Sequence, residues 1–165
     1  MNAVAAPVAE AWRVKRSMGR CWGFTLGSLG LYGAYWLYQT RKLIDHELRH
    51  GRDDATFHTV GFFVPILNYF VLYWLWRDID RLRQSIGLPR FEVGLFVGLS
   101  VIGGTPVTYS IVLNRLNEYW DYRSQGWASD APVTTGEKLT LLVGIFYALM
   151  LLGFLVFLIV VLASA

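Results

Sequence analysis

Cysteine and charge are both scarce in this chain of 165 residues. Cys21 is the only cysteine, which excludes an intrachain disulfide and any metal cluster built on cysteines. Charged residues make up 16% of the chain and form no concentrated basic face of the kind that binds nucleic acid. The sequence also lacks a P-loop, a dinucleotide-binding glycine fingerprint and the nucleophile elbow of a hydrolase. These absences argue against nucleic-acid partners and against the commonest nucleotide-dependent and hydrolytic enzymes.

Long uncharged runs are what the sequence has instead, and 55% of the chain is hydrophobic. The runs cover residues 21–39, 60–76, 93–113 and 139–165. Each reaches or approaches the ~20 residues that a helix needs to cross a hydrocarbon core of ~30 Å. The composition therefore predicts an all-α integral membrane protein with about four apolar helices.

Glycine and proline interrupt the first three runs. The interrupting residues are Gly23, Gly27 and Gly30 in the first run, Pro65 in the second, and Gly103, Gly104 and Pro106 in the third. Proline removes a backbone donor and bends or ends a helix, and small residues let a neighbouring helix approach closely. We therefore expect these three helices to be kinked or broken near the middle of each run.

A charged, amphipathic stretch follows each interrupted run and ends at a glycine. The three glycines, Gly51, Gly87 and Gly126, lie 36 and 39 residues apart, which suggests one structural unit used three times. In the second stretch, Ile79 and Leu82 form an apolar stripe between acidic and basic residues. This pattern predicts helical extensions that lie at the membrane surface.

The predicted organisation has four parts: a basic N-terminal segment 1–20, a three-unit membrane domain 21–126, a loop 127–138 and a C-terminal transmembrane helix 139–165. Lysine and arginine are almost equally frequent in the loops on the two sides of the predicted bundle, so the positive-inside rule hardly favours one orientation over the other. We expect four crossings with both termini in the cytoplasm. The alternative is that the interrupted runs enter and leave from one face as re-entrant hairpins, which would also explain the even distribution.

Part of the chain resembles a known family. The stretches LGSLGLYGAYWLYQTRKLI, VPILNYFVLYWLWRDIDRLRQSIGLP and VLNRLNEYWD are similar to the bacterial membrane-protein family known as domain of unknown function 4234. The resemblance covers roughly residues 16–122 and implies a small multi-pass protein of the bacterial cytoplasmic membrane. It brings no activity, cofactor or catalytic residue to this chain.

One short string has the form of a zinc-binding motif. His46, Glu47 and His50 match H-E-x-x-H, in which two histidines on one helix face hold Zn²⁺ and the glutamate acts as general base. Arg49 and Gly51 do not suit that motif, because it needs an uncharged spacer and a helix that continues. We therefore assign His46 and Glu47 to a solvated helix face and expect no catalytic residue and no cofactor, with zinc as the alternative.

Aromatic side chains near the ends of the runs are predicted to set the depth of the helices in the membrane, because such rings bury their bodies in hydrocarbon and keep a polar group at the interface. The predicted anchors are Tyr35, Trp36, Tyr73, Trp74 and Trp120. By contrast, we expect Arg81 and Arg83 to be mobile surface charges that contribute little to stability.

These features favour a non-enzymatic membrane module that organises lipid or a partner protein. The expected partners are the lipid bilayer and either another membrane protein or a second copy of the chain. One alternative function is a membrane zinc metallopeptidase that uses the H-E-x-x-H string. A second is a subunit of an oligomeric channel or transporter for small solutes.

Overall fold

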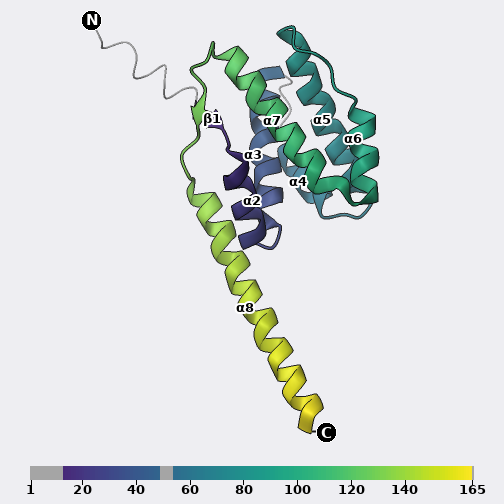
Figure 1. Ribbon diagram of the computed structural model, residues 1–165, viewed down its shortest axis with the longest axis vertical. Helices are drawn as coiled ribbons and strands as arrows, with labels where there is room; N and C mark the ends of the chain where they lie inside the picture. Colours follow the sequence, from purple (N-terminus) through teal and green to yellow (C-terminus); the bar gives the residue numbers. More distant parts are fainter. Residues whose placement is uncertain (1–12, 49–53, 165) are drawn as a thin grey trace, which may run out of the picture. The chain divides into compact units, whose positions relative to one another are not determined.

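The computed structural model describes residues 13–48 and 54–164, and most of these residues are helical (Figure 1). The chain divides into two compact units. The larger unit consists of Met1–Met18 with Trp36–Pro132, and the smaller unit of Gly19–Tyr35 with Val133–Ala165. The predominance of helix agrees with the all-α prediction.

The smaller unit begins with a helical hairpin. Helix α2 (Met18–Gly27) is followed by a tight turn and by α3 (Leu31–Leu48), whose first turns belong to this unit. Leu29 and Gly30 both have positive φ, at 51° and 91°, so the chain reverses at the glycine that the sequence marks as an interruption. Across the turn, the Sγ of Cys21 lies 3.8 Å from the Oη of Tyr32.

Helix α8 (Thr135–Ser164) completes the smaller unit. Its first turns contact the hairpin, where the fully buried Glu137 accepts hydrogen bonds from Arg20, from the hydroxyl of Tyr32 at 3.0 Å and from the backbone N–H of Thr134 at 2.8 Å. Beyond Gly144, nearly all of the side chains of α8 are exposed, and they are almost all apolar. The remainder of this helix therefore has an apolar surface along its whole length.

The larger unit contains the rest of α3, two more helical hairpins and a pair of short parallel strands, β1 (Arg13–Lys15) and β2 (Ser129–Asp130). The first of these hairpins is α4 (Ala55–Phe62) with α5 (Leu67–Ser85), and α4 packs against α5. The second is α6 (Val93–Leu99), a π-helical segment η1 (Ser100–Gly104) and α7 (Thr105–Arg123). Helix α5 contacts both α6 and α7, and the buried apolar side chains of α5 and α7 include Leu72, Leu75, Trp76, Ile79, Val112, Leu113 and Leu116.

Both hairpins of the larger unit turn at the interruptions that the sequence predicts. The α4–α5 turn contains Pro65 and Ile66, and Ile66 has a φ of 71°. The α6–α7 reversal occurs at Ile102 and Gly103, and Gly103 has a φ of 92°, which favours glycine. Both turns lie at the lower end of this unit in Figure 1. The prediction that glycine and proline break these runs is confirmed.

In the part of the chain that the structure describes, two helical stretches are long and apolar enough to cross a membrane, Val93–Arg123 and Thr135–Ser164. The first contains the reversal at Gly103, whereas α8 is a single helix of 30 residues, about 45 Å long. The first two predicted runs form hairpins whose entering helices, α2 with 10 residues and α4 with 8, are only about 15 and 12 Å long. Neither α2 nor α4 can cross a hydrocarbon core of ~30 Å by itself.

The extension that contains Asp78 and Arg83 differs from the prediction of a helix at the membrane surface. It is the continuous second half of α5, and Asp78, Asp80 and Arg83 are buried. The guanidinium group of Arg83 donates to the backbone oxygen of Arg115 at 2.8 Å and to Glu118 at 2.7 Å. Because both acceptors compensate its burial, Arg83 is part of the core, and its prediction as a mobile surface charge is wrong.

Candidate functional site

A buried cluster of charged side chains joins α3 to α5 in the larger unit. The guanidinium group of Arg41 on α3 donates to Asp78 on α5 at 2.6 Å and lies 2.9 Å from Asp45, one turn further along α3. All three residues are buried. We call Arg41, Asp45 and Asp78 the polar clamp.

The sequence places these groups together through helix periodicity. Arg41 and Asp45 are four residues apart and therefore share one face of α3. Asp78 lies three residues after Leu75 and four residues before Leu82, both buried, so it shares their face of α5 and is buried with them. Burial raises the pKa of the Asp45 carboxyl above its ordinary value, and the charge of Arg41 opposes that rise.

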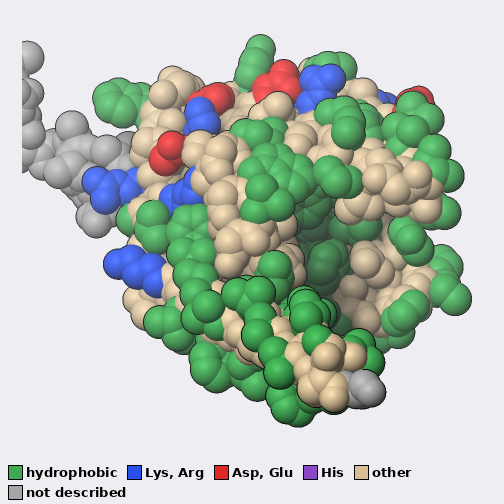
Figure 2. Space-filling view, turned by 60° about the horizontal axis from the view of Figure 1, so that its bottom comes forward, with side chains coloured by type: hydrophobic (Ala, Val, Ile, Leu, Met, Phe, Trp, Pro, Cys, Tyr) green, Lys and Arg blue, Asp and Glu red, His purple; other side chains and the backbone are tan. Residues whose placement is uncertain are grey.

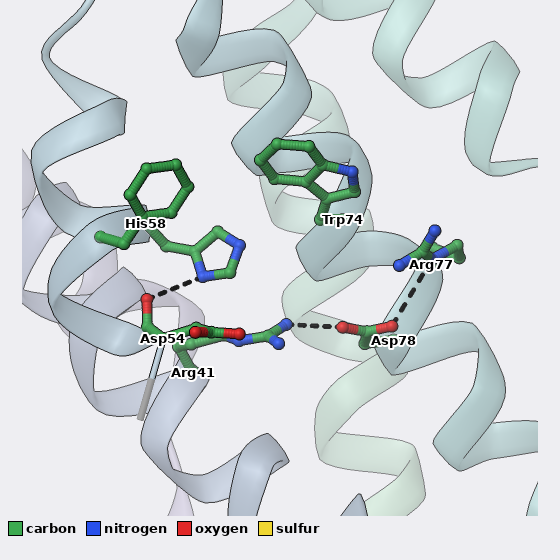
Figure 3. A pocket seen from close by; sticks show the side chains of 7 residues that line it. Arg41, Asp54, His58, Trp74, Arg77 and Asp78 are labelled. Carbon is green, nitrogen blue, oxygen red and sulfur yellow. Dashed lines mark hydrogen bonds and ion pairs between the residues drawn. The ribbon is translucent and has the colours of Figure 1, made fainter. Parts of the chain in front are cut away.

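A cavity of about 280 Å³ lies beside the polar clamp (Figure 3). Its lining consists of Arg41, Asp54, Phe57, His58, Trp74, Arg77 and Asp78. The Nδ1 atom of the buried His58 is 2.9 Å from the backbone oxygen of Asp54, and the imidazole ring meets the indole of Trp74 edge to face at 5.7 Å. A carbonyl oxygen only accepts, so Nδ1 is the donor, and Nε2 of a neutral His58 is then an acceptor.

The polar side chains that line this cavity have a structural role. In the described part of the chain, its lining includes no serine, threonine or cysteine that could act as a nucleophile beside His58. The lining contains two aspartates and two arginines besides His58, and Asp78 is held by Arg41, Arg81 and Arg77 at 2.6, 3.2 and 3.6 Å. The polar clamp therefore connects α3 and α5, with Arg41 between two carboxyl groups and with Arg77 and Arg81 adding positive charge beside Asp78.

Comparisons with other proteins add no assignment to this site. No protein-family model, no curated protein and no solved structure matched the chain. The resemblance to the family of unknown function therefore stays a prediction.

The three residues of the H-E-x-x-H string have different environments. His46 is exposed on α3, whereas Glu47 is half-buried, accepts a hydrogen bond from the hydroxyl of Tyr119 at 3.1 Å and lies 3.7 Å from Nε of Arg123. His50 lies outside the described residues. Among residues 13–48 and 54–164, no group of three His, Cys, Asp or Glu side chains is placed to hold a metal ion. The placement of His46 agrees with a solvated face, but that of Glu47 does not, because Glu47 joins α3 to α7.

We expect Glu47→Ala and His46→Ala to differ in stability although the two residues are neighbours. Losing the carboxylate removes the acceptor of the Tyr119 hydroxyl, and we expect a loss of about 1 kcal/mol in the free energy of unfolding. His46→Ala removes an exposed side chain and should change this free energy by less than about 0.5 kcal/mol. Denaturation of both variants in an uncharged detergent measures the difference, and equal effects would contradict the Glu47–Tyr119 contact.

Two of the five predicted interface anchors are core residues. Trp36 and Trp120 are only 1% and 2% exposed, and Trp36 packs against Tyr109 with ring centroids 4.5 Å apart. Their prediction as interface anchors is therefore corrected, because both rings are buried inside the larger unit. Tyr73 is exposed, and Trp74 is half-buried in the wall of the cavity.

Tyr35 belongs to the smaller unit, where its hydroxyl lies 2.7 Å from that of Thr134. Tyr35 is half-buried, so part of its side chain is accessible while its hydroxyl contacts Thr134.

Sequence reasoning missed Arg41, Asp45, His58 and Asp78 as members of one site. A detectable signal existed in the three-unit repeat, because Arg41, Arg77 and Arg115 each lie ten residues after the first residue of their helices, which begin at 31, 67 and 105. An arginine that recurs at one position of the repeat could have indicated Arg41, although Arg41 is buried whereas Arg77 and Arg115 are partly exposed.

Proposed function

We propose that this chain is an integral membrane protein whose three helical hairpins enter the bilayer from one face and turn back near its middle, while α8 crosses it. In this proposal the protein is a non-enzymatic module that organises lipid at that face. The resemblance to a family of bacterial membrane proteins supports a location in the bacterial cytoplasmic membrane.

The observation that carries this proposal is the length of the uncharged arms. No Asp, Glu, Lys or Arg lies between Arg20 and Arg41, between Asp54 and Arg77, or between Glu92 and Arg115. On the returning helices α3, α5 and α7, the first charged residue is always an arginine ten residues after the start of the helix. Ten residues of α-helix rise about 15 Å, which is half of a hydrocarbon core of ~30 Å.

The turns of the hairpins expose apolar side chains, as a position near the middle of the bilayer requires. Leu29, Ile66 and Ile102 are 53%, 72% and 79% exposed. A soluble protein gains nothing from such apolar loop tips, whereas hydrocarbon accommodates them without cost. Figure 2 also shows hydrophobic side chains at many places on the surface, among them those of α8, whose C-terminal end comes forward in this view.

Backbone groups at the tips are satisfied locally, as a lipid environment demands. The N–H of Gly30 donates to the oxygen of Thr25 at 2.8 Å, and that of Leu67 donates to the oxygen of Pro65 at 2.9 Å. The loops agree with entry from one face, because lysine and arginine number four, four, four and three in the segments before and between the four runs. If the three hairpins leave by the face they enter, these segments all lie on one side, and no charge bias between two sides is expected.

The proposal predicts that the loops on either side of the third run lie on the same side of the membrane. We would replace Cys21 by Ala and introduce Ser85→Cys, before α6, or Ser129→Cys, after α7; both serines are exposed. A membrane-impermeant maleimide applied to one side should label both variants or neither, because the α6–α7 hairpin returns to its face of entry.

A cysteine at the α4–α5 turn, Val64→Cys, provides the matched control and should resist the reagent from both sides until detergent is added. Labelling of Ser85→Cys and Ser129→Cys from opposite sides would mean that the third run crosses the membrane and would reject the hairpin proposal. Release of the chain by alkaline carbonate would reject its integral membrane location.

A further inference from the structure

We propose that a cavity at the polar end of α5 binds the phosphate group of a membrane lipid. The inference rests on the proposed function, because it assigns the lipid group that the module recognises. The cavity has a volume of about 690 Å³. Its lining consists of Tyr73, Arg77, Asp80, Arg81, Gln84, Arg90, Phe91, Glu92, Val93 and Gly94.

Guanidinium groups dominate the accessible part of this cavity. The side chains of Arg77, Arg81 and Arg90 are 39%, 52% and 80% exposed. The acids that pair with them, Asp78 and Asp80, are buried behind them. Glu92 is the exposed acid of the lining, so three accessible cations face one accessible anion. A ligand that enters the cavity therefore meets an excess of positive charge.

The buried acids hold the arginines in place. Asp78 lies 3.2 Å from Nη1 of Arg81 and 3.6 Å from Nε of Arg77, and Arg77 also lies over the ring of Tyr73. These contacts use one edge of each guanidinium group. Arginine has five N–H donors, so the remaining donors of Arg77 and Arg81 can bind a phosphate, for which the guanidinium fork is well suited.

Asp80 shapes the other wall of the cavity. Its carboxylate accepts a hydrogen bond from the backbone N–H of Phe91 at 3.1 Å and lies 3.9 Å from Nε of Arg90. This acid therefore ties the loop between α5 and α6, which carries Arg90, to α5. Because Arg77 and Arg81 are held by Asp78 before a ligand arrives, less side-chain order has to be gained on binding.

The depth of the cavity points to a lipid as the source of the phosphate. Arg77 lies about 15 Å along α5 from the hairpin turn and Arg81 one turn further, so a hairpin that reaches the middle of the bilayer places both at the headgroup layer. Tyr73 and Val93 add apolar surface to the lining. A free phosphate ion would use only the arginines, whereas a phospholipid would also contact the apolar part.

The test uses the full chain purified in dodecyl maltoside in a buffer without phosphate. Thermal unfolding is followed while dihexanoyl phosphatidylglycerol, below its micellar concentration, or inorganic phosphate is added. We expect the lipid to raise the melting temperature of the wild type in a saturable manner. In the double variant Arg81→Gln, Arg90→Gln the apparent affinity should fall by about tenfold or more, because two charge-assisted hydrogen-bonding groups are lost.

Arg115→Gln is the matched control, because Arg115 has a similar exposure, lies on α7 and does not line the cavity. This variant should bind the lipid as the wild type does. Should the double variant fail to fold, Arg90→Gln alone tests the same cavity, since that side chain is the most exposed of the three.

Equal affinity of the wild type and the cavity variants, or an equal loss in Arg115→Gln, would overturn the inference. Inorganic phosphate that stabilises the wild type as strongly as the lipid does would overturn the lipid as the source of the phosphate. Carbonate extraction of the same membranes separates the two proposals. If the chain stays in the membrane but the lipid titration is absent, only this inference fails, whereas release of the chain rejects the proposed function itself.

Discussion

Arg41→Met should lower the free energy of unfolding by about 3–5 kcal/mol, the range found when one partner of a buried ion pair is removed. Arg41 is the cation that faces both Asp45 and Asp78 inside the larger unit. Asp78 keeps Arg81 at 3.2 Å, but Asp45 loses the arginine that forms its ion pair. The cost therefore arises mainly from a carboxyl group that is buried without its counterion. Denaturation in an uncharged detergent measures it.

The dependence of this loss on pH distinguishes lost charge compensation from lost packing. Burial already raises the pKa of Asp45 from its ordinary value of 3.8, and removing Arg41 removes the charge that opposes the rise. A group whose pKa is raised by folding stabilises the folded state at low pH, and this contribution is lost as the pH rises through the folded-state pKa. The deficit of Arg41→Met relative to the wild type should therefore be smaller near about pH 4.5 than near about pH 8.

Two variants control this experiment. Arg81→Met removes a half-exposed arginine that pairs with Asp78 and should cost no more than about 1 kcal/mol. The double variant Arg41→Met, Asp45→Leu removes the buried carboxyl group together with its counterion and should recover part of the lost free energy of unfolding. A loss in Arg41→Met that is independent of pH and unchanged in the double variant would mean that packing of the arginine stem, rather than charge, holds α3 and α5 together.

The positions of the hairpin turns could be predicted from the sequence because they depend on local backbone chemistry. Pro65 cannot donate a helical hydrogen bond, and Gly103 adopts a positive φ that few other residues tolerate. What the chain does after such an interruption depends on tertiary contacts. The same uncharged run can continue across a membrane as a kinked helix or turn back as a hairpin, and hydropathy is identical in the two cases.

The burial of charged and aromatic groups could not be predicted in the same way. An amphipathic pattern predicts which face of a helix is apolar, but it does not tell whether the opposite face meets water or another helix. Arg83 is buried because the carbonyl of Arg115 and the carboxylate of Glu118, from a helix more than thirty residues away in sequence, receive its hydrogen bonds. Trp36 and Trp120 are core residues for the same reason.

The residues of the candidate site could not be found from local sequence motifs. The H-E-x-x-H string attracts notice because its residues are adjacent, yet Glu47 serves as an acceptor for Tyr119. The polar clamp joins residues 37 positions apart, Arg41 and Asp78, and no local pattern marks that pair. The repeated arginine register could have indicated Arg41, but its partner was to be found only in the folded chain.

Gly144→Ala should destabilise the smaller unit, because at this residue α8 packs directly against the backbone of the turn between α2 and α3. A Cβ atom at position 144 would lie 2.3 Å from the Cα of Ser28 and 2.7 Å from its carbonyl carbon. Both are backbone atoms and cannot rotate away, so either α8 or the turn must move. Overpacking of this kind typically costs about 1–3 kcal/mol. Hydrogen exchange should therefore become faster in α2 and in the first turns of α8.

Gly153→Ala is the matched control, because it makes the same change on the same helix where no atom lies within 4 Å of the added Cβ. Alanine forms helix more readily than glycine, so this variant should be unchanged or more stable by up to about 1 kcal/mol. Intrinsic helix preference favours alanine equally at both positions. The two variants should therefore change stability in opposite directions only because of the contact between residue 144 and Ser28. If Gly144→Ala also left hydrogen exchange in α2 unchanged, α8 would not be seated on Ser28, and the contacts of Glu137 with Arg20 and Tyr32 would be insufficient to hold its first turns against the hairpin.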